Sequence, residues 1–508
     1  MSLASVPTSA APPVLLDPRP RWNLVERIAF RFFFCYFILY ILPFPIGELS
    51  GLIASVRMLT RSHEPTMEEL MNDEPSEPFF EKYITKPYKD GMDWSVLWVG
   101  KQVFKKELEY RPLGSGDTTW NYVQIFAIAF VSATLTLLWT LTASLWWRFR
   151  QREQPAYPYL HEALHIYVRF YLAYYMVIYG SFKVIKLQFP SASADGLLHT
   201  YGESSPMHLL WTFMGASEGY NWFTGGGEVL GGFLLCFRRT TLLGALVSCG
   251  VMVHVAALNF CYDVPVKLFS MHLVLASLFV MSPDWPWLFR VFVLGQRTTP
   301  RGMTTLSRWK WLNWSAFALR TLVVGTFLTV TFYGAVKQSK VYGDKAPQPP
   351  MSGLWDVAEF TLDGNVRPPL TTDAGRWQRF VIVNNFRGTM LMATTMTGGK
   401  MTYLASVDDE SHTIVLSSFG AAPGQPPTGT IQFTKVFAEL YLMDGEVQMF
   451  ADGKFGKKQV RMLVRHVGDD KFLLKSRGFH WINEWPYNFY GPRDQPPPKI
   501  PPPPKPKE

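Results

Sequence analysis

Apolar residues gather into long blocks over the first two thirds of the chain and alternate with polar residues in the last third. The blocks between residues 24 and 335 approach the roughly 20 apolar residues that a membrane-spanning helix needs. They predict a polytopic α-helical membrane protein. About seven spans are expected, at residues 28–46, 121–147, 165–186, 221–237, 240–260, 267–289 and 312–335.

The Lys and Arg residues between the blocks indicate which way the spans face, because cytoplasmic loops are enriched in them. They lie before the first span and after the second, fourth and sixth, whereas the connection 187–219 has none. This predicts a cytoplasmic N-terminal tail (residues 1–27), a cytoplasmic loop and last span at 291–336, and an extracytoplasmic C-terminal domain. Residues 28–162 would hold the first two spans and an extracytoplasmic loop at 47–120. Asp117 or Thr118 ends that loop as a predicted helix N-cap.

Short segments of alternating polarity follow a linker at 337–350 and predict eight to ten strands. The DG pairs at 363–364, 444–445 and 452–453 and the GG pair at 398–399 indicate turns. An antiparallel barrel or sandwich is expected at 351–492, followed by a Pro-rich tail at 493–508. Gly353 and Trp355 form a GxW pattern that resembles the first strand of lipocalins. That resemblance implies that Arg477 packs across Trp355 and closes the base of the barrel.

Composition and charge argue against several protein classes. Hydrophobic residues make up 48% of the chain and charged residues only 18%, which is too apolar for an ordinary soluble enzyme. The net charge of +9 forms no basic stripe, so we expect no nucleic-acid partner. The four cysteines lie in or beside apolar blocks without a CxxC pair. This argues against a disulfide framework, a zinc ribbon or a thiol redox site.

Polar residues inside the predicted spans supply the candidate site, because an ionisable group in a membrane is costly and commonly functional. We predict a catalytic proton relay through Glu228 and His254. The ligand-binding candidates near the outer face are Lys183, Asn259, Asp263, Lys267 and His272. The alternative is structural: an interfacial Asp263–Lys267 ion pair, with the other polar groups pinning helices together. Arg31 and Arg169 lie near the cytoplasmic ends and are expected to snorkel to the surface.

The run HEALH matches the helical zinc-protease pattern, in which His161 and His165 would bind the metal and Glu162 would act as base. No third ligand stands out on the predicted cytoplasmic side. We therefore interpret the run as an interfacial lead-in helix, and we predict no metal site.

Residues of about 163–290 resemble the DoxX family of bacterial membrane proteins. The resemblance rests on VRFYLAYYMVIYGSFKVIKLQFP, on FTGGGEVLGGFLLCF and on the two following spans. It implies a four-helix bundle in the bacterial inner membrane with a Gly-flanked acidic residue, the position of Glu228. Founding members are linked to a thiosulfate:quinone oxidoreductase, but this chain departs from them by its extra spans, its outer loop and its fused barrel.

The expected function is therefore that of a DoxX-like membrane protein whose bundle binds a quinone or a lipid-like ligand. Such a protein would serve a redox process with an electron-transfer partner protein. No haem, flavin or iron–sulfur ligand set is visible, so electrons would come from that partner or from a substrate. The alternative is a non-enzymatic membrane anchor or lipid-binding protein that acts through its external barrel. By architecture alone, the chain also resembles the vitamin K-dependent carboxylases.

Overall fold

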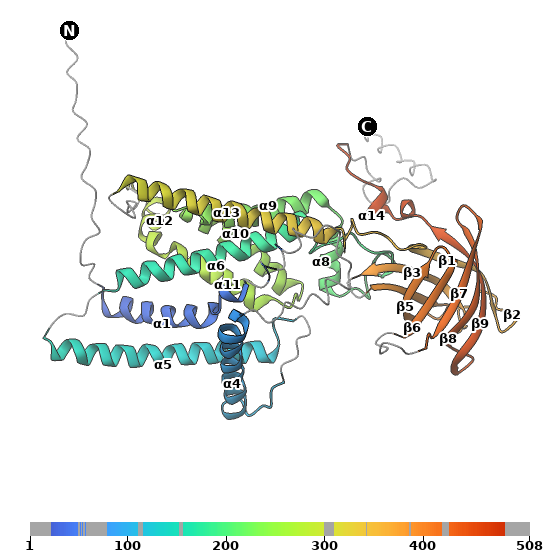
Figure 1. Cartoon of the computed structure of the whole chain (residues 1–508), viewed down its shortest axis with the longest axis horizontal. Coiled ribbons are helices and arrows are strands. Elements are labelled where there is room, and N and C mark those ends of the chain that lie inside the picture. Colours follow the sequence, from blue (N-terminus) through green and yellow to red (C-terminus); the bar gives the residue numbers. More distant parts are fainter. Residues whose placement is uncertain are drawn as a thin grey trace, which may run out of the picture. The chain divides into compact units, whose positions relative to one another are not determined.

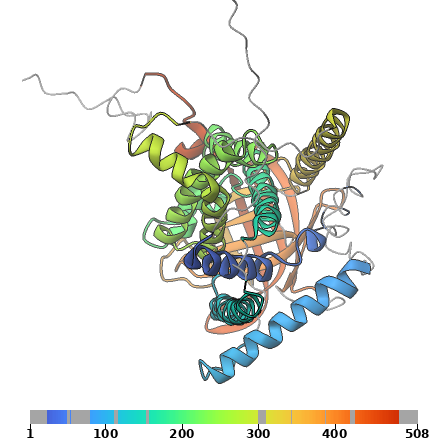
Figure 2. The ribbon, with the colours of Figure 1, turned by 90° about the vertical axis from the view of Figure 1, so that its left-hand side faces the viewer.

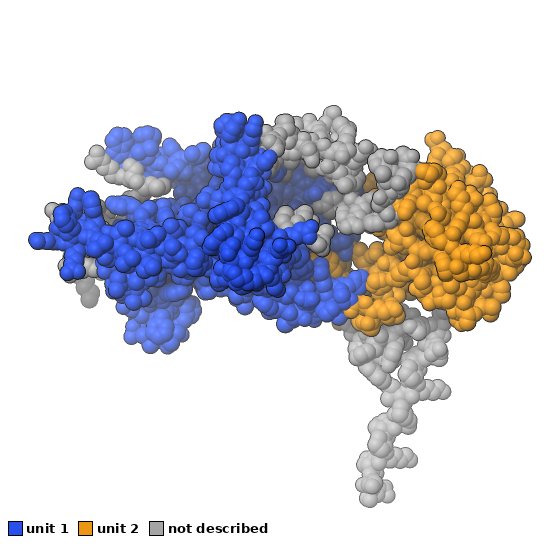
Figure 3. All heavy atoms as spheres, turned by 90° about the horizontal axis from the view of Figure 1, so that it is seen from below, with its two compact units in different colours: residues 1–190, 205–210, 217–344 blue, residues 191–204, 211–216, 345–508 orange. Residues whose placement is uncertain are grey.

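The chain folds into two compact units (Figure 3). The helical unit comprises residues 1–190, 205–210 and 217–344, and the barrel unit comprises residues 191–204, 211–216 and 345–508. The computed structural model describes residues 22–48, 51, 53, 56, 79–109, 115–151, 156–298, 309–341, 343–385, 388–418 and 426–482. The predicted Pro-rich tail, most of the N-terminal tail and much of the outer loop lie outside the described residues.

A helix occupies each of the seven predicted spans (Figure 1). Five of these segments are long and apolar enough to cross a membrane, namely those of α1, α5, α10, α11–α12 and α13. The remaining two, α6 and α9, carry more polar residues. The helix bounds are α1 Leu24–Ile41, α5 Thr119–Phe149, α6 Pro158–Val184, α9 Glu218–Leu235, α10 Thr241–Cys261, α11 Lys267–Met281, α12 Trp285–Phe292 and α13 Lys310–Ser339.

Four of these helices form a closed ring of contacts. Helix α6 packs against α9 and α11, and α10 packs against the same two helices. Figure 2 looks along this group. Their shared core is built from buried apolar side chains such as Leu172, Met176 and Leu273, and α1 packs against α5 and α6 beside it. The turn η3 (Ser282–Asp284) separates α11 from α12, so the predicted sixth span is divided near Pro283.

The predicted outer loop contains helices that the sequence did not indicate. They are η1 (Ile46–Glu48), η2 (Glu81–Thr85) and α4 (Lys86–Gln102). Helix α4 lies transverse to α5 in Figure 1 and buries Val96 and Val99 against Trp120 and Val123 of α5. Helix α5 begins with a capping box between Thr118 and Asn121, so the predicted N-cap at Thr118 is confirmed.

The C-terminal strands form a closed antiparallel barrel of eight strands, β1 and β3 to β9, in sequence order. The first and last strands pair from Leu354–Val467 to Leu362–Val460, which closes the sheet. The strand bounds are β1 Gly353–Leu362, β2 Asn365–Val366, β3 Trp377–Asn385, β4 Gly388–Thr395, β5 Lys400–Asp408, β6 Thr413–Ser418, β7 Gly429–Phe437, β8 Leu440–Ala451 and β9 Lys454–Val467.

Three of the four predicted glycine turns are confirmed, because Gly364, Gly398 and Gly453 have positive φ at strand ends. The turn predicted at 444–445 is wrong. Gly445 lies inside β8, where a Cβ would collide with the backbone oxygen of Thr430 on β7. Glycine is needed there for the close approach of two strands rather than for a bend.

Side chains from alternate positions of the strands fill the interior of the barrel, as expected for a small barrel. The ring of Trp355 lies against Phe380, Tyr441 and His466. The buried guanidinium of Arg376 donates to the carbonyls of Val357 and Ala358 at a bulge in β1. The predicted contact of Arg477, which follows the short helix α14 (Leu473–Ser476), with Trp355 stays a prediction.

Two parts of the connection after α6, residues 191–204 and 211–216, belong to the barrel unit. Its short helix α7 (Ala194–Leu198) packs against β1 and β3. His199 accepts a hydrogen bond of 2.9 Å from Lys400 of β5. Helix α8 (Pro206–Gly215) follows. A segment that the sequence presents as a plain loop between two spans is therefore divided between the barrel unit and the helical unit.

Candidate functional site

Helices α6 and α9 approach each other closely because glycines face glycines. A Cβ on Gly180 would lie 2.7 Å from the carbonyl oxygen of Gly225, and a Cβ on Gly225 would lie 2.7 Å from that of Gly180. Two turns further along α9, a Cβ on Gly232 would meet the carbonyl oxygen of Ala173 at 2.9 Å. Small residues at this spacing let two helix backbones touch. The approach brings the next polar residues of both helices together.

The polar residues brought together are Lys183 and Glu228. The ammonium of Lys183, three residues after Gly180, donates to Oε1 of Glu228, three residues after Gly225. Their side chains are only 7% and 2% exposed. The second carboxylate oxygen of Glu228, Oε2, is buried and has no hydrogen-bond partner among the described residues. Buried polar atoms are almost always hydrogen-bonded, so Oε2 is an acceptor that a further donor could satisfy.

A column of tyrosines on α6 leads away from this ion pair. Tyr171, Tyr175 and Tyr179 are spaced four residues apart, with ring centroids 4.9 and 6.2 Å apart. Tyr179 lies close enough to Glu228 for the carboxylate charge to act on its hydroxyl group. The hydroxyl of Tyr175 donates to Glu48 of η1 at 2.9 Å. The site is thus a buried acid and base next to tyrosine rings that contact one another, edge to face at Tyr171 and Tyr175 and stacked at Tyr175 and Tyr179.

His272 belongs to the same interior. Its Nδ1 donates to the carbonyl of Leu268 at 2.6 Å, which leaves Nε2 to accept from the hydroxyl of Tyr36 at 2.6 Å. The ring of Tyr40 stacks on the imidazole at 4.0 Å and contacts Tyr171 at 6.5 Å. The tyrosines of α1 therefore connect His272 to the tyrosine column. We did not predict them, although the run YFILY, with Tyr36 and Tyr40 one turn apart, could have indicated them.

The polar turn between α10 and α11 has protein partners of its own. Lys267 pairs with the 83%-exposed Asp263 at 2.8 Å, and the buried Asn259 donates weakly to Val266. The carboxylate of Asp117 accepts from the backbone N–H groups of Lys267 and Leu268 at 2.7 and 3.0 Å. Asp117 thus caps α11 rather than α5, and it fastens the start of α5 to this turn. These contacts fit the structural interpretation of Asn259, Asp263 and Lys267.

His254 is not brought to the site, although we had placed it beside Glu228. Helix α10 buries Ser248, Met252, Ala256 and Asn259, whereas His254 lies on its exposed face. Successive residues on a helix turn by about 100°, so a residue two positions from the buried stripe points away from it. The sequence predicted the depth of His254 along the span but not the side of the helix on which it lies. No contact between His254 and Glu228, both of which the structure describes, supports the predicted proton relay.

Arg31 and Arg169 do not snorkel, which corrects a second expectation. Arg31 is fully buried, and its guanidinium donates to Thr140 and Tyr157 at 2.8 Å each. It also lies over the rings of Trp139 and Tyr157. Arg169 is 4% exposed. Neighbouring helices cover both side chains, a packing feature that position in a span does not reveal.

The HEALH side chains are engaged with the protein. Glu162 forms an ion pair with Arg238 at 3.0 Å, and Nε2 of His165 hydrogen-bonds the carbonyl of Val280 at 2.8 Å. The ring of His161 contacts Trp22 at 5.9 Å. Within the ranges that the structure describes, no group of three or more His, Cys, Asp or Glu side chains could hold a metal ion. The run lies at the start of α6, where a lead-in helix was expected.

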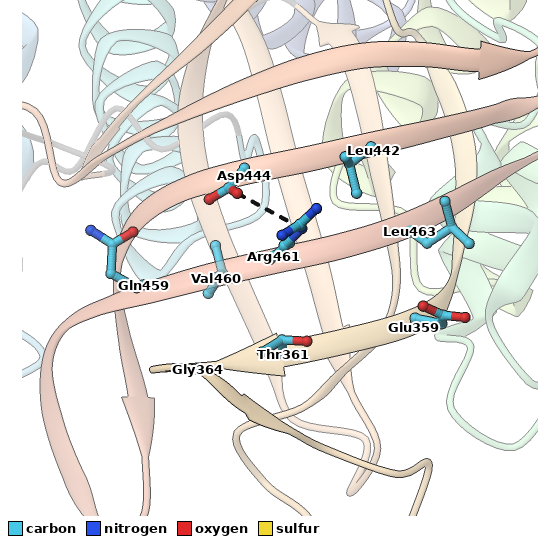
Figure 4. A pocket seen from close by; sticks show the side chains of 9 residues that line it. All are labelled: Glu359, Thr361, Gly364, Leu442, Asp444, Gln459, Val460, Arg461 and Leu463. Atoms are coloured by element: carbon cyan, nitrogen blue, oxygen red, sulfur yellow. Dashed lines mark ion pairs between the residues drawn. The ribbon is translucent and has the colours of Figure 1, made fainter.

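A hollow on the barrel is of a different kind (Figure 4). It lies over β1, β8 and β9. Its polar side chains, such as Arg461 and Asp444, alternate with the buried Met443 and Met462, so they belong to the outer face. Arg461 and Asp444 face each other across it at 3.9 Å. It is an open surface groove between two weakly paired charges, and we assign it no chemistry.

Comparison with known proteins relates part of the chain to a protein that is itself uncharacterized. No family model matches the chain. A segment of 116 residues, 23% of the chain, is 32% identical to the uncharacterized protein YwoB of Bacillus subtilis and covers 73% of YwoB. The chain belongs to the YwoB family. YwoB has no assigned activity, so this membership adds a relative for about a quarter of the chain and leaves the chemistry to the site. The resemblance to DoxX proteins stays a prediction.

Proposed function

We propose that the helical unit is a DoxX-like membrane bundle that binds the polar head of a quinone or a similar lipid-like ligand between α6 and α9. The observation that supports this proposal is the open, buried oxygen Oε2 of Glu228 beside the Lys183 ammonium. A quinone or quinol head offers a carbonyl or hydroxyl group that such a pair can bind. The five long apolar helices supply the setting for a ligand with a lipid tail.

Each residue of the site would have a separate role in binding the ligand. Lys183 holds Oε1 of Glu228 and fixes the direction of Oε2. Oε2 is then positioned to accept a hydrogen bond or a proton from a ligand hydroxyl, as a general base must be. The rings of Tyr175, Tyr179 and Phe269 contact one another at 5.1 to 6.2 Å, and this aromatic cluster would offer an outer ring face to a planar head group.

A bound quinone would carry the electrons of the redox process, and the protein would bind, orient and exchange protons with it. The fit between site and ligand rests on the orphaned carboxylate oxygen and on the aromatic surroundings. Electrons would come from a partner protein or a substrate. For such a process we also propose an inner-membrane location, with the N-terminus cytoplasmic and the barrel on the periplasmic side.

The rival proposal assigns a lipid-like ligand to a lipocalin-like barrel. Lipocalins hold a ligand inside the barrel, whereas buried side chains such as Phe360, Trp377 and Met443 fill this interior. A ligand there would have to displace them. The bundle is therefore the better-supported location, and the barrel is left as a surface for partners or as a structural domain.

The test is mass spectrometry of small molecules that co-purify with the full chain in a gentle detergent. Glu228→Gln keeps the shape of the side chain and removes its charge. Glu218→Gln makes the same change at an exposed position on the same helix. We expect a quinone or lipid-like molecule with the wild type and with Glu218→Gln, and its loss from a folded Glu228→Gln. Equal retention by all three proteins would contradict the proposal.

A further inference from the structure

A second polar centre lies at the opposite end of α6 from Lys183. Arg169 and Lys183 are roughly 14 residues, or 21 Å, apart along the helix. Three segments meet near Arg169: α6 itself, the turn from Phe237 to Thr241, and α13. Ring centroids of Phe237 and Phe317 are 6.4 Å apart, so α13 packs on the turn at this point. Arg320, one turn after Phe317, extends from the same side of α13.

Arg169 is the buried member of this centre. Its Nη1 donates to the hydroxyl of Thr241 at 3.2 Å, and its guanidinium lies over the ring of Phe170. Its Nε is buried and has no hydrogen-bond partner among the described residues. A buried cation is expected to be paired or fully hydrogen-bonded, and an open donor on it indicates that a further acceptor belongs there.

Positive charge exceeds negative charge around Arg169. The charges of Arg238, Arg320 and Glu162 are close enough to act on its guanidinium. Glu162 is already paired with Arg238 at 3.0 Å. Among the described residues, the guanidinium groups of Arg238 and Arg320 and the carboxylate of Glu162 therefore lie around Arg169. An anion bound among them would offset the excess positive charge that the fold places at this point.

The first turn of α10 points at the same place. Helix α10 begins at Thr241, and the side chain of its N-cap residue, Thr240, does not cap the first N–H groups. The hydroxyl of Thr240, the usual capping candidate, donates instead to the carbonyl of Leu234 at 2.6 Å. Uncapped N–H groups and the positive end of the helix dipole attract anions, phosphate above all. Here the helix end and the hydroxyl bound by Arg169 belong to the same residue.

We propose that Arg169, Arg238, Arg320 and the N-terminus of α10 form a binding site for a phosphate group. Arginine forks and helix N-termini are the groups that bind phosphate oxygens. The phosphate could come from an anionic lipid headgroup or from a free phosphate compound. The site lies in the part of the helical unit for which the Lys and Arg pattern predicts the cytoplasmic side. It is independent of the ligand proposed at Glu228.

The experiment measures the unfolding temperature of the full chain, washed free of lipid in neutral detergent, during two titrations. One uses phosphatidylglycerol and the other inorganic pyrophosphate. The variants are Arg320→Gln, at a half-buried position, and Arg169→Gln. The matched control is Arg290→Gln, an exposed arginine of α12. For Arg320→Gln and Arg169→Gln we expect a roughly ten-fold or greater loss of apparent affinity, typical of a lost charged hydrogen bond. Arg290→Gln should behave as the wild type does.

Stabilisation by phosphatidylglycerol alone would identify a lipid headgroup as the source, and stabilisation by both titrants would indicate a site for any phosphate. Without titrant, Arg169→Gln should unfold no earlier than the wild type, because it removes a buried charge. A wild type that responds to neither titrant would overturn the proposal. So would an equal response from all four proteins. If Arg169→Gln does not fold, Arg320→Gln against Arg290→Gln decides the question.

Discussion

Lys183 and Glu228 form a buried ion pair, and losing one partner should lower the free energy of unfolding. Each side chain is almost fully covered, so Lys183→Met would leave an uncompensated carboxylate inside the bundle. We expect this variant to lose about 3–5 kcal/mol of unfolding free energy. The double variant Lys183→Met with Glu228→Leu should recover most of the loss. Reversible unfolding in mixed detergent measures both. A double variant as unstable as the single one would contradict the account.

Asp117 and Asp263 both lie beside Lys267, but only Asp117 bonds the backbone of α11. We expect Asp117→Ala to cost about 1 kcal/mol or somewhat more, as the loss of a helix cap does. Asp263→Ala removes an exposed ion pair and should cost between zero and about 1 kcal/mol. The measurement is the same unfolding assay. Equal losses, or the reverse order, would show that the cap is not what holds this turn.

At the residue scale, the sequence was a good guide to which polar side chains are buried. It was a poorer guide to which neighbours they contact. Lys183, Glu228 and His272 are buried polar groups, as their positions in spans suggested. His254 and Arg169 were misplaced because depth in a span follows from counting residues, whereas the face of a helix depends on its neighbours. Asp117 or Thr118 was expected to cap α5, and Thr118 does so, whereas the bonds of Asp117 to α11 cross 150 residues of sequence. No local pattern contains such a contact.

Glycines set the distance between α6 and α9. A methyl group at Gly225 would meet the carbonyl oxygen of Gly180, whereas one at Gly226 would meet nothing within 4 Å. We expect Gly225→Ala to destabilise the bundle by about 1–3 kcal/mol, as overpacking does. Gly226→Ala should be neutral or slightly stabilising, because Ala favours helix. Unfolding of the two variants side by side checks this. A harmless Gly225→Ala would mean that the helices can move apart freely.

Ion pairs on the barrel make its stability depend on pH. The hydrogen bond from Lys458 lowers the pKa of Asp363, and that from Arg367 lowers the pKa of Asp452. A lowered folded-state pKa gives stability that is present above the unfolded value of about 3.9 and is lost as pH falls through the folded value. We therefore expect the barrel to unfold at lower denaturant concentration at pH 3 than at pH 6. The sheet band in infrared spectra measures this, and Asp363→Asn should weaken the dependence. A pH-independent midpoint would contradict it.

At the element scale the periodicities of the sequence were informative. Apolar blocks predicted the long helices, and alternation with turn signals predicted the strands. Helix α4 was missed because its apolar face is narrow and its other positions are charged or polar. The pair at 444–445 was misread because a glycine that permits close strand contact looks the same in sequence as a glycine that permits a turn.

Cysteine labelling can test the predicted orientation of the whole molecule in the membrane. In a background lacking the exposed Cys261, we expect Glu410→Cys on the barrel to react with a membrane-impermeant maleimide in intact cells. Gln151→Cys, in the connection after α5, should react only after the cells are opened. Both positions are exposed, so accessibility of the side chain does not limit labelling. The reverse pattern would invert the topology that the Lys and Arg residues predict.

The division of the chain into two units was predictable from the change of periodicity near residue 350. The inclusion of residues 191–204 in the barrel unit was not, because it depends on contacts of α7 with β1 and β3. The candidate site was predictable in part: the acid on α9 stood out among glycines. Its partners from α1, and the arginines around Arg169, are brought together only by the packing of helices that are distant in sequence.

The central claim is that Glu228 contacts a ligand in the bundle. The most direct test is equilibrium binding of a short-tailed quinone to the full chain in detergent, for the wild type, Glu228→Gln and Glu218→Gln. We predict that Glu228→Gln, measured below its unfolding temperature, binds roughly ten-fold or more weakly, and that Glu218→Gln binds normally. The unpaired ammonium of Lys183 should lower the unfolding temperature of Glu228→Gln. Equal affinity of all three proteins, or no binding by the wild type, would contradict the account.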